Sequence, residues 1–331
     1  MTADVYVSGV SAWLPDTACT VEEAVSQGRY DADRAATDGF TSVCIEEHLS
    51  PPEMALRAVR PLLRPEDASA INSLYLCSIH RHGHKLLWPP ASYLHPVLEL
   101  DSRTRVMSLN QGCNGGFTAV SLAYDLIRAG LPGDQLVVGA DRFSGSAFDR
   151  FNSDLGTLYG DAAFALRLSA APGAYRIACL ELESEPALEP MYRAVRPEPE
   201  GPGDHDVKSA KKACLEAHGR EGFNALFIPA LQRLRRRLLE TADLETRPAD
   251  YVIYPNAGAG LSARLYAGAF ADLARQDMWG LGRSIGHTGT ADQLIGLWEL
   301  GRRQVLRKHD RVLMIGAGNG LGLAAMLLEK T

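Results

Sequence analysis

The chain has 331 residues, of which 46% are hydrophobic and 22% charged, and its formal net charge at pH 7 is -6. This acidic balance argues against nucleic acid or an anionic membrane as the main partner. No apolar run reaches the roughly 20 residues of a membrane-spanning helix, and the start MTADVYVSGV lacks the pattern of a signal peptide. We therefore expect a cytoplasmic protein that works on small molecules or proteins, with a sizeable core in one large domain or two fused halves.

The first part of the chain alternates strands with helices. Apolar runs and their spacing predict strands at residues 5–10, 71–79, 105–109, 133–141 and 161–169, and helices at 52–63 and within 88–100. The run at 71–79 is continuously apolar, which is typical of a strand buried on both faces of a parallel sheet.

The stretch from Met107 to Gly130 joins a strand to an amphipathic helix through a glycine-flanked cysteine, Cys113. Unpaired N–H groups at a helix N-terminus favour the thiolate form, which attacks carbonyl groups. The glycines around it, Gly112, Gly115 and Gly116, permit a sharp turn and a close approach by substrate. A buried, inert cysteine is the alternative.

The remaining cysteines and three histidines offer no convincing metal site. The six cysteines lie far apart without a CxxC pair, so we expect reduced thiols and neither disulfides nor a metal cage. His80, His82 and His84 alternate after a predicted strand, but without a second ligand cluster they favour a polar loop over a metal site. We expect no metal and no cofactor.

The pattern begins again at Tyr175. A strand at 175–184 is followed by a polar, proline-rich stretch at 185–206 and a long helix near 207–242, whose arginines at 233 and 235–237 favour a solvated face over a docking patch. A strand at 251–254, helices at 261–274 and 290–306, and two strands within 311–330 complete the chain. The sequence thus predicts two successive β/α halves.

Two motifs in this second half are ambiguous by themselves. GAGNGLG, which contains Gly318, resembles a dinucleotide fingerprint but has only nine residues after Gly322, so a turn with N–H groups facing a site is favoured. His287, in SIGHTGTADQ, is a lone histidine, and such residues are more often structural than catalytic.

The order of these pieces resembles the thiolase superfamily, specifically its ketoacyl-ACP synthase III-like branch. The landmarks are SGVSAWLPD, the PPAS loop, NQGCNGGF, YGDAAFAL, IGHTGTA and IGAGNGLGLAAML. The resemblance implies a five-layer αβαβα fold of two duplicated halves, 1–172 and 173–331, and a homodimer. It also implies that Cys113 accepts an acyl group and that the backbone N–H groups of Cys113 and Gly318 form an oxyanion hole.

Departures from the family pattern change the expected chemistry. Condensing members pair the cysteine with a histidine and an asparagine, but here Pro255 takes the histidine position, with Asn256 after it, and His287 takes the asparagine position. The resemblance therefore implies that the histidine and asparagine donors, which hold an enolate in condensing members, are replaced here by the single imidazole of His287. Acyl transfer to a hydroxyl or amine needs only an activated cysteine, an oxyanion hole and one base, which Cys113, Gly318 and His287 supply.

Further site residues follow from this interpretation. Asp292 either orients His287 as the third member of a triad or caps a helix at the surface. Asn256, Asn114 and Thr288 are predicted to contact substrate.

The resemblance also bears on the acyl donor. Relatives that use coenzyme A clamp its adenine with a tryptophan and arginines that are missing from DRAATDGF and DLGTLYGD. We therefore expect an acyl carrier protein, whose acidic surface needs basic residues. The available ones are Arg29, Arg34, Arg81, Arg142, Arg150 and the cluster at 233–237.

The predicted function is acyl transfer from a carrier-protein thioester, through Cys113, to a sugar or aminocyclitol-like acceptor in natural-product (antibiotic) biosynthesis. Alternatives are a condensing synthase with an altered triad, a thioesterase, and a non-catalytic partner subunit or carrier-protein-binding module.

Overall fold

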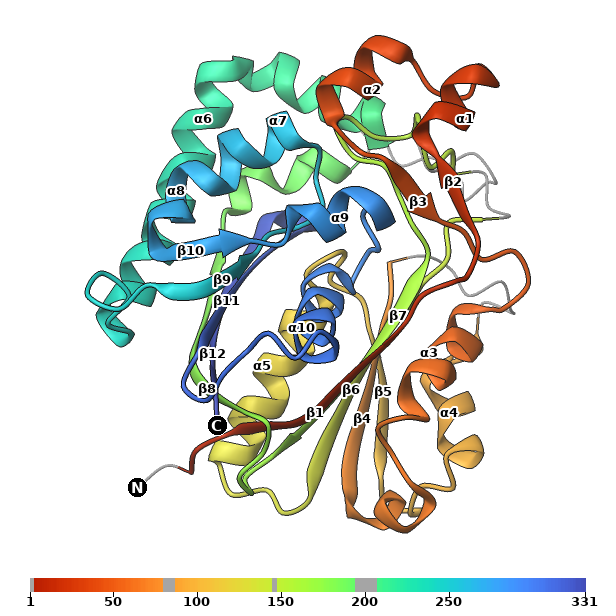
Figure 1. The fold of residues 1–331 in the computed structure, drawn as a ribbon, viewed down its shortest axis with the longest axis vertical. Helices are drawn as coiled ribbons and strands as arrows, with labels where there is room; N and C mark the ends of the chain where they lie inside the picture. Colours follow the sequence, from red (N-terminus) through yellow and green to blue (C-terminus); the bar gives the residue numbers. More distant parts are fainter. Residues whose placement is uncertain (1–2, 80–86, 145–147, 194–206) are drawn as a thin grey trace.

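The computed structural model describes residues 3–79, 87–144, 148–193 and 207–331. Within these residues, ten strands form one sheet in the order β10-β9-β11-β12-β8-β1-β7-β6-β4-β5 (Figure 1). A second, two-stranded sheet pairs β2 with β3, next to the short helices α1 and α2. These smaller elements are β2 (Ala18–Thr20), α1 (Val21–Ser26), α2 (Ala32–Asp38) and β3 (Ser42–Cys44).

The two ends of the large sheet repeat one topology. In the first half, the first and last strands pair antiparallel, the last pairs antiparallel with the fourth, and the remaining pairs are parallel; the second half repeats this order. The strands are β1 (Tyr6–Trp13), β4 (Ile71–Cys77), β5 (Arg105–Leu109), β6 (Asp134–Asp141) and β7 (Ala162–Ser169), then β8 (Tyr175–Ser184), β9 (Ala249–Ile253), β10 (Ala274–Asp277), β11 (Arg311–Gly318) and β12 (Gly322–Lys330).

The two halves meet where β1 pairs with β8, through Tyr6 with Arg176 and Val7 with Tyr175. The turn between β7 and β8 contains the division predicted at residues 172 and 173. That boundary stays a prediction, whereas the duplicated strand order is a property of the structure.

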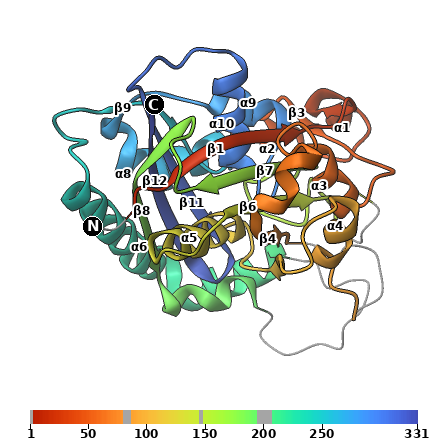
Figure 2. The same cartoon turned by 90° about the horizontal axis from the view of Figure 1, so that it is seen from below.

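Helices form three layers around the two ends of the sheet. The central layer is α5 (Gly115–Arg128) with α10 (Asp292–Arg302), whose apolar faces share one core with strands of both halves. One outer layer is α3 (Pro51–Val59) with α4 (Ala91–Val97), and the other is mainly α6 (Val207–Thr241) with α8 (Gly268–Phe270). Figure 2 shows these outer layers on opposite sides of the molecule. The predicted five-layer arrangement is confirmed.

The central helices occupy equivalent places in the two halves, because each packs between the two ends of the large sheet and leads into a strand of its own half, β6 or β11. Cys113 lies two residues before the start of α5, and His287 lies in the loop before α10. The glycines at the start of α5 bring the two helix N-termini together: a Cβ at Gly116 would lie 3.0 Å from the Thr290 carbonyl oxygen.

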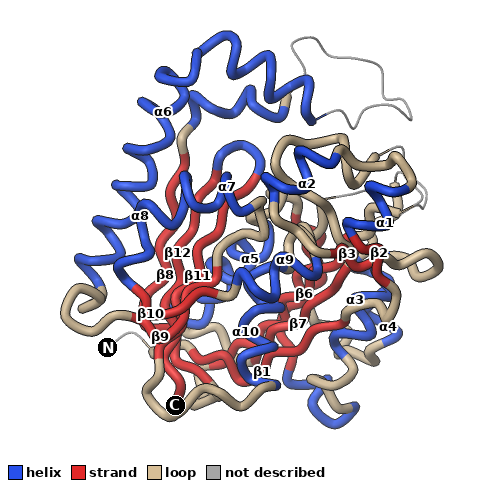
Figure 3. Tube along the Cα trace, turned by 45° about the horizontal axis from the view of Figure 1, so that its top comes forward, coloured by secondary structure: helices blue, strands red, loops and turns tan. Residues whose placement is uncertain are grey.

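Most predicted elements are present, and the differences are local. The helix predicted at 261–274 is broken into α7 (Ala259–Ser262), a π-helical turn (Ala263–Ala267), α8 and a 3₁₀ turn (Ala271–Leu273). Figure 3 labels α7 and α8 along this stretch. α6 is kinked at Gly219, where φ is 66°. Part of the stretch predicted to be irregular, Pro186–Tyr192, is a 3₁₀ helix.

Two further expectations concern the three alternating histidines and membrane-spanning helices. His80, His82 and His84 lie outside the described residues. In the part of the chain that is described, no helix is long and apolar enough to cross a membrane.

Candidate active site

Cys113 lies at the turn between β5 and α5, where the sequence placed it. Gly112 has a φ of +54°, a conformation that favours glycine and permits the sharp turn. All six cysteines lie in the described residues and are free; Cys113 is partly exposed, whereas the other five are buried. Partial exposure at a helix N-terminus distinguishes Cys113 as the accessible thiol.

His287 and Asp292 complete a three-residue constellation with this thiol. His287 Nε2 lies 3.0 Å from Cys113 Sγ, and His287 Nδ1 lies 2.5 Å from Asp292 Oδ2. His287 is 6% exposed and Asp292 is 2% exposed. Asp292 is therefore not at the surface, and its carboxylate lies within hydrogen-bonding distance of the imidazole.

The charge on His287 follows from these neighbours. Burial by itself lowers the pKa of His287, but the negative charges of Asp292 and Cys113 raise it well above its ordinary value of 6.5. These neighbours therefore favour the protonated form of His287.

The loop that carries His287 is held from both sides. The His287 N–H donates to the Leu158 carbonyl at 2.7 Å, and the Gly160 N–H donates to the His287 carbonyl at 2.9 Å. Gly286 and Gly289 have φ values of +80° and +67°, and a Cβ at Gly289 would lie 2.2 Å from Asp141. The glycines on either side of the histidine therefore allow a conformation and a packing that other residues would obstruct.

The glycine-rich turn after β11 packs directly against the cysteine turn. A Cβ at Gly318 would lie 2.5 Å from the backbone nitrogen of Asn114, and one at Gly112 would lie 2.7 Å from the Asn319 side chain. Cys113 Sγ lies 3.8 Å from Asn319 Oδ1. Two backbone segments thus approach one another beside the sulfur, an arrangement that suits an oxyanion hole made by Cys113 and Gly318.

The three residues predicted to contact substrate are all buried. Asn256 donates its backbone N–H to Asp292 Oδ2 at 2.8 Å and its side-chain Nδ2 to the Gly286 carbonyl at 2.9 Å. Thr288 donates its N–H and its hydroxyl to Asp292 Oδ1, at 2.6 and 2.7 Å. These contacts favour a positioning role for Asn256 and Thr288 over the predicted contact with substrate.

Asn114, 3% exposed, lies against the glycines of β11. Its Oδ1 has no hydrogen-bond partner within the described residues. A Cβ at Gly316 would lie 2.5 Å from that oxygen, so the side chain packs against β11.

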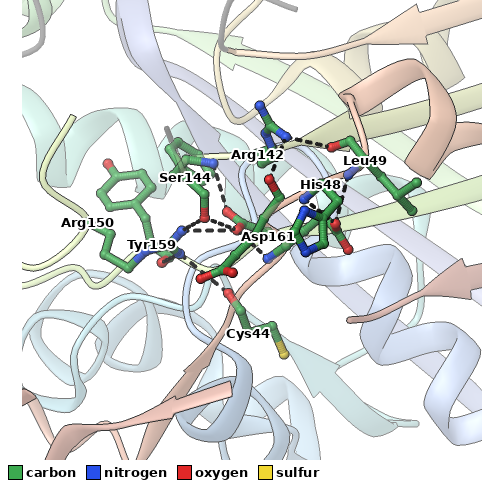
Figure 4. A network of polar contacts seen from close by, with 11 residues as sticks. Cys44, His48, Leu49, Arg142, Ser144, Arg150, Tyr159 and Asp161 are labelled. Atoms are coloured by element: carbon green, nitrogen blue, oxygen red, sulfur yellow. Dashed lines mark hydrogen bonds and ion pairs between the residues drawn. The ribbon is translucent and has the colours of Figure 1, made fainter. Parts of the chain in front are cut away.

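A buried ion pair fixes the segment that flanks His287 (Figure 4). Asp161 accepts hydrogen bonds from Arg150 Nη2 at 3.0 Å and from the backbone N–H groups of Glu46 and Phe143 at 2.8 and 2.7 Å. Arg150 in turn donates to the Tyr159 carbonyl at 2.7 Å. Since Tyr159 lies between the two residues that bond the His287 backbone, this network holds the histidine loop in place.

Several residues near the site escaped the sequence-based prediction. The Tyr159 ring packs edge-on against the His287 ring, with centroids 5.1 Å apart, and its hydroxyl donates to Asp154. Asp154 also binds Lys211, 57 residues later in the chain. Tyr159 belongs to the YGDAAFAL landmark and could have been noted there, whereas no local pattern links Asp154 to Lys211.

The arginines considered for carrier-protein docking have partners within the chain. Arg150 is only 9% exposed, so it is not a surface group. On α6, Arg233 pairs with Glu183 and Glu185, Arg235 with Asp272, Arg236 with Glu240, and Arg237 with Glu181 and Glu183. These pairs favour the solvated-face interpretation. Arg29, Arg34 and Arg142 also bond to neighbouring groups, and Arg81 lies outside the described residues.

Comparison with known proteins agrees with this architecture. The family model described as 3-oxoacyl-[acyl-carrier-protein (ACP)] synthase III matches residues 107–186, and the model of its C-terminal domain matches residues 239–330. Together the two matches span just over half of the chain. The beta-ketoacyl-[acyl-carrier-protein] synthase III of Clostridium perfringens (strain SM101) is 25% identical over 221 residues, which is 67% of each chain.

Solved structures of related proteins have the same fold. ChlB3, described as an acyltransferase, is 28% identical with a TM-score of 0.90, over 99% of this chain and 98% of that one. The 3-oxoacyl-[acyl-carrier-protein] synthase III of Aquifex aeolicus VF5 shares the fold, with 19% identity and a TM-score of 0.73 over 98% of this chain and 99% of that one. The chain therefore belongs to the ketoacyl-ACP synthase III-like family of the thiolase superfamily, whose members are enzymes.

Proposed function

We propose that this protein is an acyltransferase that carries an acyl group on Cys113 and delivers it to a hydroxyl or amine. The observation that carries the proposal is the constellation of Cys113, His287 and Asp292, with 3.0 Å from sulfur to imidazole and 2.5 Å from imidazole to carboxylate. A nucleophile, a base and a group that orients the base are the requirements of acyl transfer.

In the first step, the Cys113 thiolate attacks the carbonyl carbon of an acyl thioester. The N–H groups of Cys113 and Gly318 stabilise the negative charge on the carbonyl oxygen. The carbon–sulfur bond to the carrier then breaks, and the departing thiolate takes the proton held by His287. The acyl group is left on Cys113, and His287 is neutral and able to accept a proton.

In the second step, the acceptor's hydroxyl or amine attacks the acyl-enzyme while His287 Nε2 takes its proton. The second tetrahedral intermediate collapses by breaking the bond to Cys113 Sγ, which leaves as a thiolate. The cycle ends with the thiolate–imidazolium pair restored. Asp292 stabilises the imidazolium each time it forms, and Asn256 and Thr288 hold Asp292 in place.

The same residues fit decarboxylative condensation less well. That reaction needs two donors for the enolate of a malonyl thioester, whereas Pro255 has no donor in its side chain and the Asn256 amide is engaged with the Gly286 carbonyl. The similarity to ChlB3, which is described as an acyltransferase, also supports transfer.

An acyl carrier protein is the proposed donor. The family model and the curated relatives are described as 3-oxoacyl- and beta-ketoacyl-[acyl-carrier-protein] synthases III. The stretches where the resemblance expects the tryptophan and arginines of a coenzyme A clamp lack those residues. A small polar acceptor such as a sugar or aminocyclitol, in a natural-product pathway of the cytoplasm, completes the proposal.

A homodimer is proposed as the assembled form. β5 ends the ten-stranded sheet, and no further strand pairs with it in the described ranges. Its side chains Val106, Met107 and Leu109 are half-buried. A second copy of the chain pairing at this edge would satisfy the backbone groups of β5. Sedimentation equilibrium measures the mass in solution, and a monomer at all concentrations would contradict this part of the proposal.

Intact-mass spectrometry tests the central step. The protein is incubated with carrier proteins bearing malonyl, short acyl or aryl thioesters, and an acyl adduct is expected on wild type but not on Cys113→Ala. Loss of the adduct on adding an amine or hydroxyl acceptor indicates transfer, whereas a carbon–carbon product with malonyl carrier protein indicates condensation. Absence of an adduct with every donor would overturn the acyl-enzyme mechanism.

A further inference from the structure

A second buried ion pair lies next to the site, between α6 and the segment before β7. Lys211 Nζ lies 2.6 Å from Asp154 Oδ1; Lys211 is 8% exposed and Asp154 is 2% exposed. Removing both charges from water is costly, and such pairs add little stability by themselves. The Lys211–Asp154 pair lies beside the proposed active centre, so we consider a role in the chemistry of the site.

Asp154 connects this pair to His287 through one tyrosine. The Tyr159 hydroxyl donates to Asp154 Oδ2 at 2.6 Å, and the Tyr159 ring packs edge-on against His287 with centroids 5.1 Å apart. Burial, together with the charges of Asp154 and Cys113, raises the pKa of Tyr159 well above its ordinary value. Tyr159 therefore remains a hydrogen-bond donor, and its ring cannot turn away from His287 without breaking its bond to Asp154.

Lys211 also fixes the first segment of α6, residues 207–218, which is set apart from the rest of the helix by the kink at Gly219. The Lys208 N–H donates to the Ser153 carbonyl at 2.9 Å, and Val207 packs against the cluster of Phe143, Phe148 and Tyr159. Lys211 Nζ lies 4.8 Å from the centre of the Tyr192 ring. Burial alone lowers the pKa of Lys211, but the charges of Tyr192 and Asp154 raise it, so the ammonium form persists.

We propose that Asp154 and Lys211 are positioning residues, which hold Tyr159 against His287 and keep the charge beside the Cys113–His287 pair balanced. The first segment of α6 is thereby coupled to the reactivity of the thiol. This inference rests on the proposed function in one respect only, that Cys113 and His287 act as a pair.

Other charged and titratable groups also surround His287, and none of those described below balances the charge of Asp154. Cys113 precedes α5, and Asp292 begins α10. Asp141 at the end of β6 accepts from Thr290 behind the histidine loop, and Asp161 is neutralised by Arg150. Tyr192 and Tyr266 complete the surroundings from the second half. Lys211 is the cation that balances Asp154 on the Tyr159 side.

Alkylation of Cys113 by iodoacetamide tests the coupling without any carrier protein or acceptor. The other five cysteines are buried, so peptide mass spectrometry can follow Cys113 alone as a function of pH. The variants are Lys211→Met, Asp154→Asn, the double variant that combines these two changes, and Lys211→Arg, which keeps the positive charge. Lys212→Met, at the exposed neighbouring lysine, is the matched control.

The two single variants are expected to act in opposite directions. Lys211→Met leaves the negative charge of Asp154 unbalanced and disfavours the thiolate, so the midpoint of the alkylation profile rises by roughly half to one pH unit. Asp154→Asn leaves the positive charge of Lys211 and lowers the midpoint. The double variant, Lys211→Arg and Lys212→Met stay close to wild type.

Midpoints of both single variants that match the Lys212→Met control would overturn the proposal, as would shifts in the same direction. If thermal unfolding shows that a single variant does not fold, Tyr159→Phe tests the proposal in its place. It keeps both charges and the ring but removes the bond to Asp154, and we expect the plateau alkylation rate to change at least threefold. An unchanged plateau rate would contradict positioning through Tyr159.

The experiment also separates this inference from the proposed function. Opposite midpoint shifts without any acyl adduct would support the coupling and reject acyl transfer. Adduct formation and transfer in wild type, with unshifted midpoints in the variants, would support acyl transfer and reject the coupling.

Discussion

Asn256 donates its backbone N–H to the same Asp292 oxygen that binds His287, at 2.8 Å. Asn256 follows Pro255, the residue at the position where condensing relatives are expected to carry a histidine. The backbone of this segment binds the same carboxylate that bonds the imidazole. In the proposed mechanism, the segment contributes through its backbone and not through a catalytic side chain.

Asp292→Asn should slow discharge of the acyl-enzyme by roughly 10²- to 10⁴-fold, because an amide neither balances the imidazolium nor fixes its tautomer. The measurement is single-turnover discharge, followed by intact mass. Asp16→Asn, at an exposed position, serves as the control. A discharge rate within twofold of wild type would remove Asp292 from the mechanism.

His287→Ala should still accept an acyl group on Cys113 but release it slowly, since no base remains to take the acceptor's proton. The expected loss is roughly 10²- to 10⁴-fold in the discharge step. Because the two residues act as a unit, His287→Ala with Asp292→Asn should be no slower than His287→Ala alone. Additive losses in the double variant would contradict a shared role.

Gly318→Ala should reduce turnover by roughly 10²-fold or more, since its Cβ would meet the Asn114 backbone nitrogen and displace the proposed oxyanion hole. Gly280→Ala is a matched control, because its Cβ meets nothing within 4 Å. In α9 (Trp279–Ile285) that change should stabilise the fold by about 0.5–1 kcal/mol. Equal turnover by the two variants would contradict a role for Gly318 in the proposed oxyanion hole.

The raised pKa of His287 predicts a pH-dependent contribution to stability. Folded His287 keeps a proton that the unfolded chain releases near pH 6.5, so the contribution is complete below that pH and is lost as pH rises toward the folded pKa. Urea unfolding measures it in Cys113→Ala, with and without His287→Gln, because a thiolate at Cys113 would release a proton and cancel the one that His287 keeps. Their difference should shrink by up to about 1.4 kcal/mol per pH unit above 6.5. A difference that grows with pH would show that folded His287 is neutral.

Wild type provides a further check, because the proposed mechanism has a thiolate at Cys113. That thiolate has released a proton which an unfolded cysteine keeps up to about pH 8.5, so it offsets the proton that His287 keeps. In wild type the contribution should therefore stay level between about pH 6.5 and 8.5. A decline across this range would mean that the folded thiol keeps its proton.

The elements and the accessible thiol could be predicted from sequence because their signals are local. Apolar runs such as 71–79 and the glycine-flanked Cys113 carry their meaning within a short window. The resemblance to a known family then placed His287 near Cys113, 174 residues away, which no spacing rule could do.

Other features depend on contacts that a sequence does not display. The burial of Asp292 could not be predicted, because the helix it begins carries polar residues that suit a surface as well as a core. The positioning contacts of Asn256 arise from backbone atoms, which every residue has. Lys211 follows a polar, proline-rich stretch, and only the folded chain shows that its charge is buried against Asp154.

The equivalence of the two central helices has a consequence for how this site could have originated. If both halves were copies of one ancestral unit, the turns before α5 and α10 would at first have carried the same residue. A nucleophile facing an identical nucleophile cannot act as an acid–base pair. Joining the copies in one chain allows one turn to specialise as the nucleophile and the other as the base, so the division of chemical labour required divergence after duplication.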